Sequence, residues 1–230
     1  MTKFLSVQHT YHGVEVALFF DDNMVETVFD DKKRASKNLI AIISSLLKNQ
    51  NCSVDDLSFI SANQGPGPFT TLRVVIAYVN GLAFGTKKPL IGVDGLDAIL
   101  QEFSDGSYSI TVALLDAFSK DVYFAIQHKD FREVKKGYRN IFVFLQELKN
   151  VVGDETIQFI GNGVHKYKYE ILSVFKDKAF IAEQIPQQCS IKQVGLISFE
   201  KWKNVEGLTD QLLPMYLKQM AIKKLTPSSF

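Results

Sequence analysis

The sequence predicts an α/β protein of two lobes, each with a mixed β-sheet covered by helices, and three observations support this fold class. First, the order of expected elements, β-β-β-α-β-α, occurs twice along the 230 residues. Second, a polar break, Ser104-Asp105-Gly106-Ser107, separates the two copies. Third, 46% of the residues are hydrophobic and 22% are charged, which is typical of an ordered globular chain. Two copies of one α/β unit favour a site between two lobes.

The first lobe, residues 1–103, is expected to begin with strands and to continue with helices. Its strands are predicted from short apolar runs bounded by turn residues. Its first helix is predicted because apolar residues recur at helical spacing on a single stripe. In chain order we expect strands at 4–7, 14–20 and 24–29, a helix at 35–47, a strand at 57–61, a helix at 71–85 and a strand at 90–93.

The second lobe, residues 104–230, repeats this order with different residues. In chain order we expect strands at 110–115, 122–127 and 133–138, a helix at 142–148, a strand at 156–160 and a helix at 164–174. A further helix is expected at 191–202, followed by a tail at 212–224. We expect the final residues, about 205–230, to pack back on the first lobe.

The charge and the cysteine content argue against several classes of protein. Lys and Arg number 26 and Asp and Glu number 25, so the net charge of +1 argues against a stand-alone nucleic-acid-binding protein. No apolar run approaches the ~20 residues that span a bilayer, so no membrane contact is expected. Cys52 and Cys189 show no metal-ligand spacing, and free thiols favour a cytoplasmic location.

A loop with the sequence Gly-Pro-Gly-Pro-Phe-Thr-Thr-Leu-Arg occupies residues 65–73, between a predicted strand and a predicted helix. Its two glycines permit positive φ, and its two prolines fix φ near about −65°. Such a turn presents its side chains rigidly and bares backbone N–H groups, which suit an anion. A functional loop and a structural strand–helix corner fit this pattern equally well. The candidate loop residues are Gly65, Pro66, Gly67, Phe69, Thr70 and Arg73.

The helix after this loop is apolar in almost every direction. Ten of the thirteen residues from Leu72 to Phe84 are apolar. A helix that is apolar all round must be buried all round. We therefore expect one face to pack on its own sheet and the other face to meet a second layer, supplied by this chain or by a partner. A central core helix is the alternative.

Several segments together resemble the TsaB family, also called YeaZ, of bacterial tRNA threonylcarbamoyladenosine biosynthesis proteins. The resemblance covers nearly the whole chain and is strongest over residues 58–100. It rests on loop 65–73 and on the segments Gly81–Phe84, Pro89–Ile99, Asp116–Tyr123, Gly161–Gly163 and Pro214–Lys218. It implies a duplicated ribonuclease-H-like fold of the actin-like ATPase superfamily.

The same resemblance implies a non-catalytic subunit that activates a catalytic partner, TsaD. TsaD transfers a threonylcarbamoyl group to the adenosine next to the anticodon of tRNAs that read ANN codons. An ATPase, TsaE, is a further implied partner, so ATP and metal are expected in the partner subunits and no cofactor in this chain. Alone, such a chain is expected to form a homodimer, and to contact tRNA only through the complex.

The resemblance also favours a partner-facing surface on the apolar helix, because family members pair with TsaD and with themselves. Aromatic side chains on such a surface are the expected anchors, since large desolvated side chains dominate binding energies. The expected interface residues are Leu72, Val75, Ile76, Tyr78, Val79 and Leu82.

Departures from the family pattern bear on catalysis. Gln8 and His9 stand where family members commonly keep Asp and Thr, and neither replaces a carboxylate as a magnesium ligand. Asp116 is then the candidate for a residual nucleotide site. The alternative function is an actin-like nucleotide-binding enzyme, such as a kinase-like ATPase, that uses Asp116 and loop 65–73. No metal site is expected, because the spacing of His9 and His12 on a strand and turn does not converge their rings.

A basic stretch in the second lobe and a basic tail are candidates for tRNA contact. Charges along strand edges are more often solvated and guard against aggregation, so this interpretation is the favoured one. The basic residues concerned are Lys129, Arg132, Lys135, Lys136, Arg139, Lys218, Lys223 and Lys224.

Overall fold

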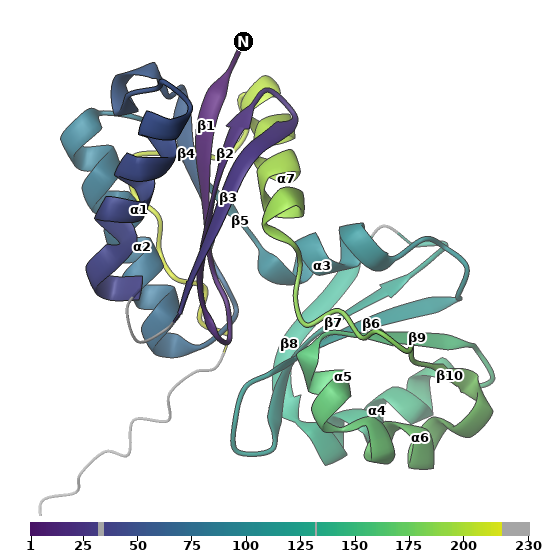
Figure 1. Cartoon of the computed structure of the whole chain (residues 1–230). Coiled ribbons are helices and arrows are strands. Elements are labelled where there is room, and N and C mark those ends of the chain that lie inside the picture. The colour runs from purple at the N-terminus through teal and green to yellow at the C-terminus, as the bar shows by residue number, and fades with distance from the viewer. Residues whose placement is uncertain (32–34, 132, 218–230) are drawn as a thin grey trace, which may run out of the picture.

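Two sheets organise the chain in the computed structural model, which describes residues 1–31, 35–131 and 133–217 (Figure 1). The first sheet has six strands in the order β11-β5-β4-β1-β2-β3. The second has five strands in the order β10-β9-β6-β7-β8. Both sheets are mixed, because each joins an antiparallel meander to parallel strands. The predicted class, an α/β fold of two lobes with mixed sheets, is confirmed.

The first sheet is built around β1, whose residues are buried on both sides. β1 pairs antiparallel with β2, with Leu5 opposite Leu18, and parallel with β4, with Leu5 opposite Ile60. The elements are β1 (Lys3–His9), β2 (Gly13–Phe20), β3 (Asn23–Asp31), α1 (Ala35–Asn49), a 3-10 turn η1 (Val54–Asp56), β4 (Phe59–Asn63), α2 (Phe69–Thr86) and β5 (Leu90–Val93). α1 and α2 lie on one face of this sheet (Figure 1).

The second sheet repeats this plan. β6 pairs antiparallel with β7 and parallel with β9, as β1 does with β2 and β4. The elements are β6 (Ile110–Asp116), β7 (Asp121–His128), β8 (Val134–Asn140), α4 (Ile141–Val152), β9 (Ile157–Ile160), α5 (Asn162–Lys166), α6 (Lys168–Phe175), a 3-10 turn η2 (Lys176–Lys178) and β10 (Ala179–Phe180). The helix predicted at 164–174 is thus two helices, separated at Tyr167, whose φ of −116° and ψ of 26° interrupt the helix.

Two helices cross between the lobes. α3 (Gly95–Phe103), which follows the first sheet in sequence, packs on β6 and β7 of the second sheet. α7 (Ile191–Lys203), which follows the second sheet, packs on β1, β2, β4 and β5 of the first sheet. β11 (Leu208–Thr209) then pairs with β5. The chain therefore returns to the first lobe at residue 191, earlier than the expected 205, and α3 belongs by packing to the second lobe.

α2 is the one helix, among the residues described, that is long and apolar enough to cross a bilayer by length and composition. A core helix of a soluble protein passes the same test. α2 packs on β1 and β4, and its buried residues belong to the largest hydrophobic cluster of the first lobe. This packing explains the apolar residues on the side of α2 that faces the sheet. It does not explain the apolar residues on the other side of the helix.

Candidate partner interface and the junction of the lobes

Loop 65–73 forms a tight corner between β4 and α2. Gly65 has φ +109°, and its N–H donates to Asn63 Oδ1 at 2.9 Å. Its carbonyl accepts from Gly95 N at 2.8 Å, which joins the loop to the start of α3. A Cβ at Gly67 would lie 2.2 Å from Cε1 of the His9 ring, so a side chain there has no room. The buried part of the loop, residues 65–68, therefore acts as a structural corner.

Phe69, Thr70 and Arg73 are the loop residues exposed to solvent, and two of them contact the C-terminal segment. The Arg73 guanidinium lies 3.9 Å from the centre of the Phe69 ring, and Arg73 Nε donates to the Tyr216 hydroxyl at 2.7 Å. Asn80 of α2 exchanges two hydrogen bonds with the backbone of Leu212, at 2.8 and 2.9 Å. Residues 211–217 thus lie along the loop and α2. The contact of Tyr216 with Arg73 was not predicted from the sequence. The available indication was that Tyr216 is an aromatic residue within one of the segments that resemble the family.

The expected partner-facing residues of α2 require a correction. Leu72, Val75, Ile76 and Val79 are at most 3% exposed and lie in the hydrophobic core of their own lobe. They cannot contact another subunit while the lobe is folded. Tyr78 and Leu82 are half-buried and pack against the same core. The helix wheel alone could not decide which face meets the sheet, since every face carries apolar residues.

The exposed face of α2 combines small residues with the large side chains of Phe69, Arg73 and Phe84. Ala77, Gly81 and Gly85 lie on it, one helical turn apart, and Phe84 projects from it with 88% of its surface exposed. On the neighbouring α1, Ile40 is 67% exposed. α1 and α2 cover the same face of the first sheet, so their exposed residues lie on the side turned away from it (Figure 1). We call this side the α1–α2 face.

At the junction of the lobes, Gln8 and His9 are buried, and the Gln8 side chain is hydrogen bonded on both its nitrogen and its oxygen. Gln8 Nε2 donates to Glu15 Oε2 at 2.9 Å and to the Cys189 carbonyl at 3.0 Å, and its Oε1 accepts from Asn63 Nδ2 at 3.1 Å. Burial lowers the pKa of His9 to about 4, with a weaker opposing effect from Asn63, so the ring is neutral at pH 7. The amide of Gln8 is fully engaged within the chain.

Asp116, the candidate for a residual nucleotide site, is held by a lysine. Both carboxylate oxygens accept from Lys166 Nζ, at 2.9 and 3.1 Å, and this hydrogen bond raises the pKa of Lys166. The Tyr11 hydroxyl donates to the Asp116 carbonyl at 2.7 Å and links the two lobes. Residue 8 thus offers a neutral amide, and the carboxylate of residue 116 has a lysine partner within the chain. Lys166 was missed in the sequence, because its pairing depends on the fold.

The histidines of the first strand and turn do not form a pair, and part of the basic stretch is bonded to acidic residues. His12 is exposed while His9 is buried, so the two rings do not share a surface. Lys136 Nζ donates to Asp94 and Asp97 at 2.6 and 2.8 Å, and Arg139 pairs with Glu147 at 3.0 Å. Four basic residues of the expected tRNA surface lie outside the described residues, namely Arg132, Lys218, Lys223 and Lys224.

Comparison with known proteins places the chain in a family. A family model described as TsaD, tRNA N6-adenosine threonylcarbamoyltransferase, matches residues 30–199. TsaB of Escherichia coli K12 is 26% identical over 148 residues, and this match covers 64% of each chain. TsaB of Bacillus subtilis 168 is 25% identical over 222 residues, covering 93% of each chain. The chain belongs to the TsaD family, within its TsaB/YeaZ group. The match to the Escherichia coli relative thus spans slightly less than two thirds of that protein.

Solved structures show the same fold. YeaZ from Pseudomonas aeruginosa superimposes with a TM-score of 0.71 at 21% identity, covering 94% of this chain and 100% of that one. A Bacteroides thetaiotaomicron protein with an actin-like ATPase fold gives a TM-score of 0.52 at 8% identity, covering 85% and 96%. The expectation of a duplicated, actin-like architecture is confirmed, as is the TsaB/YeaZ resemblance.

Proposed function

We propose that this chain is a non-catalytic, cytoplasmic scaffold that activates TsaD in the formation of N6-threonylcarbamoyladenosine on tRNA. Family membership supports the pathway, since the relatives are tRNA threonylcarbamoyladenosine biosynthesis proteins. The α1–α2 face supports the mode of action, because it offers an exposed phenylalanine beside exposed small residues. The observation that carries the proposal is the combination of an exposed helical face with a lobe junction in which Gln8 and the Asp116 carboxylate are hydrogen bonded within the chain.

The partner seated on the α1–α2 face is TsaD in the working complex and a second copy of this chain in its absence. Specific complexes bury about 800 Å² on each side, and a small set of large side chains supplies most of the affinity. Phe84 and Ile40 would be such anchors, with Ala77 and Gly81 allowing close helix approach. ATP and metal would then be bound by TsaD and by TsaE, and tRNA by the assembled complex.

Co-purification of the chain with TsaD of the same organism, followed by calorimetry, tests this proposal. We expect a stable complex on gel filtration, and no heat of binding when ATP and magnesium are titrated into the lone chain. Magnesium-dependent ATP binding by the lone chain would contradict the scaffold role and favour the kinase-like alternative. Failure to form any complex with TsaD would contradict the proposed partner.

A further inference from the structure

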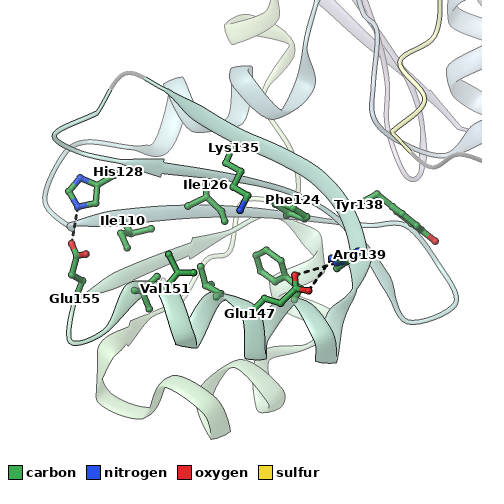
Figure 2. A pocket seen from close by; sticks show the side chains of 13 residues that line it. Ile110, Phe124, Ile126, His128, Lys135, Tyr138, Arg139, Glu147, Val151 and Glu155 are labelled. Atoms are coloured by element: carbon green, nitrogen blue, oxygen red, sulfur yellow. Dashed lines mark hydrogen bonds and ion pairs between the residues drawn. The ribbon is translucent and has the colours of Figure 1, made fainter.

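A groove in the second lobe lies away from the lobe junction and on a different lobe from the α1–α2 face. It runs between α4 and the strands β7 and β8, and its volume is about 340 Å³ (Figure 2). Small-molecule sites usually measure about 300 to 1,000 Å³ and are mostly apolar, with a few placed polar groups. The groove therefore has the size of a small-ligand site.

The alternation of residues along β8 explains why the groove is open. Lys136 bonds Asp94 and Asp97 around α3, so this residue points to the α3 side of the sheet. Because neighbours on a strand point to opposite faces, Lys135, Gly137 and Arg139 face α4. A Cβ at Gly137 would lie 2.6 Å from the ring of Phe124. This edge strand thus contributes no bulky apolar side chain toward α4, and a channel remains above the β7 side chains.

The walls of the groove are apolar and its ends are closed by polar pairs. At one end His128 Nε2 lies 2.9 Å from Glu155 Oε2, and at the other Arg139 pairs with Glu147 at 3.0 Å (Figure 2). Val151, at the mouth, is 80% exposed. The apolar walls are formed by Ile110, Phe124, Ile126, Phe144, Leu148 and Val151.

Lys135 supplies a positive charge beside these walls. Figure 2 shows its side chain reaching from β8 toward the space above α4. Lys135 makes no hydrogen bond or ion pair with any residue of the described part of the chain, whereas Arg139 and Glu147 neutralise each other. An ammonium group next to an apolar wall is complementary to an anion that carries an apolar body.

The equivalent groove of the first lobe is a natural contrast. It lies between β3 and α1, with a volume of about 320 Å³, and is lined by Glu26 and Asp30. Side chains of α1 cross it, since Asn38 donates to Asp30 at 3.2 Å and Asn49 donates to Glu26 at 2.8 Å. Its acidic, hydrogen-bonded lining would repel an anion. The groove of the second lobe also has two carboxylates in its lining, Glu147 and Glu155, but these are bonded to Arg139 and His128. Lys135 is a basic residue of a kind that the lining of the first groove lacks.

We propose that the groove between α4 and β7–β8 binds a small carboxylate with a linear apolar body, of the chemical class of medium-chain fatty acids. The carboxylate would pair with Lys135, and the hydrocarbon chain would lie over Phe124 and Ile126. This site is separate from the proposed TsaD-binding face, so it stands or falls independently of the proposed function.

Calorimetric titration of the intact chain with hexanoate, octanoate and decanoate tests the proposal, with chemical shifts locating the site. We expect saturable binding that strengthens about fourfold per methylene. Lys135→Met should weaken octanoate about tenfold and leave 1-octanol unchanged, because the charge-assisted contact alone is lost. Lys129→Met, which removes an exposed lysine outside the groove, should change neither ligand.

A second pair of variants tests the location. Val151→Asp places a negative charge at the mouth and should abolish octanoate binding, whereas Val143→Asp, on the same helix but outside the groove, should not. The proposal is overturned by an absence of saturation, by equal losses of octanoate and octanol in Lys135→Met, or by shifts confined to other parts of the molecule.

Discussion

At the scale of single residues, the contact between Gly67 and His9 shows how the motif loop serves the fold. The added methyl group of Gly67→Ala would meet the His9 ring at 2.2 Å, and the ring is enclosed. We expect a loss of about 1–3 kcal/mol in the free energy of unfolding, measured by chemical denaturation. Gly81→Ala is the matched control: nothing lies within 4 Å of its Cβ, so a gain of up to about 1 kcal/mol is expected. Equal effects at the two glycines would contradict this account.

His9 also predicts a pH dependence of stability. Its pKa is lowered in the folded chain to about 4 from 6.5, so the unfolded chain binds the proton first as the pH falls. Stability contributed by the neutral ring is therefore complete above pH 6.5 and is lost as the pH falls toward 4. Between pH 7.5 and pH 5 we expect the wild type to lose about 2 kcal/mol more than His9→Gln. Parallel pH profiles of the two proteins in urea denaturation would refute the assignment.

At the scale of elements, α2 has one face that is buried in the core of its lobe and one face that is exposed to solvent. Val79→Asp would bury a charge at a residue that is 0% exposed, and we expect it to cost at least about 4 kcal/mol of folding stability. Phe84→Asp alters a residue that is 88% exposed, so the free energy of unfolding should change by less than about 0.5 kcal/mol. Denaturation curves of the two variants measure this contrast.

The same helix gives a prediction for binding. If the α1–α2 face holds the partner, Phe84→Asp should weaken TsaD capture about 30-fold, as the loss of an anchor does. Tyr169→Asp is the control, since Tyr169 is 83% exposed on α6 of the other lobe and should leave capture unchanged. Titration calorimetry with TsaD distinguishes them, and an unaffected Phe84→Asp complex would place the partner elsewhere.

The limits of sequence reasoning are also clearest at the level of elements. Strands and helices with strong apolar periodicity, such as β2 and α1, were predicted close to their observed bounds. α3 was not predicted, although Asp94 supplied a cap signal whose side chain accepts from Leu96 N and Asp97 N. The break between α5 and α6 at Tyr167 could not be predicted, because no proline or glycine stands there. The two faces of α2 could not be told apart, because burial depends on the direction from which the sheet approaches.

At the scale of the whole molecule, the exchange of α3 and α7 makes each lobe dependent on the other half of the chain. Phe199 and Trp202 of α7 stack on Phe4 and Phe59 of the first sheet, with ring centres 6.0 and 4.9 Å apart. We expect the fragment 1–103 to lack a cooperative unfolding transition, because this aromatic face would be exposed. The intact chain should unfold in one transition by circular dichroism. A cooperatively folded fragment would show that the lobes are independent.

The exchange of α3 and α7 between the lobes could not be predicted from the sequence. The burial of Gln8 and His9 at the lobe junction could not be predicted either. An amphipathic helix reveals that it has an apolar stripe but not which sheet the stripe will cover. Gln8 and His9 belong to residue types that are mostly exposed or intermediate, so their burial could not be predicted from residue type. The partners of Gln8, Asn63 and Cys189, lie far from it in the sequence and become its neighbours only in the fold. The family resemblance predicted the fold and named Asp116 as a candidate nucleotide-site residue, and the structure shows that Asp116 pairs with Lys166.

The most direct test of the scaffold account is a tRNA modification assay with purified components. TsaD and TsaE are incubated with tRNA, threonylcarbamoyl-adenylate and ATP, and N6-threonylcarbamoyladenosine is measured without the chain, with the chain, and with Phe84→Asp. A fourth reaction contains the chain without TsaD and TsaE. The account predicts no product from the chain alone, strong product when it joins TsaD, and loss of that product with Phe84→Asp. Product formed by the lone chain, or undiminished when the chain is omitted, would contradict it.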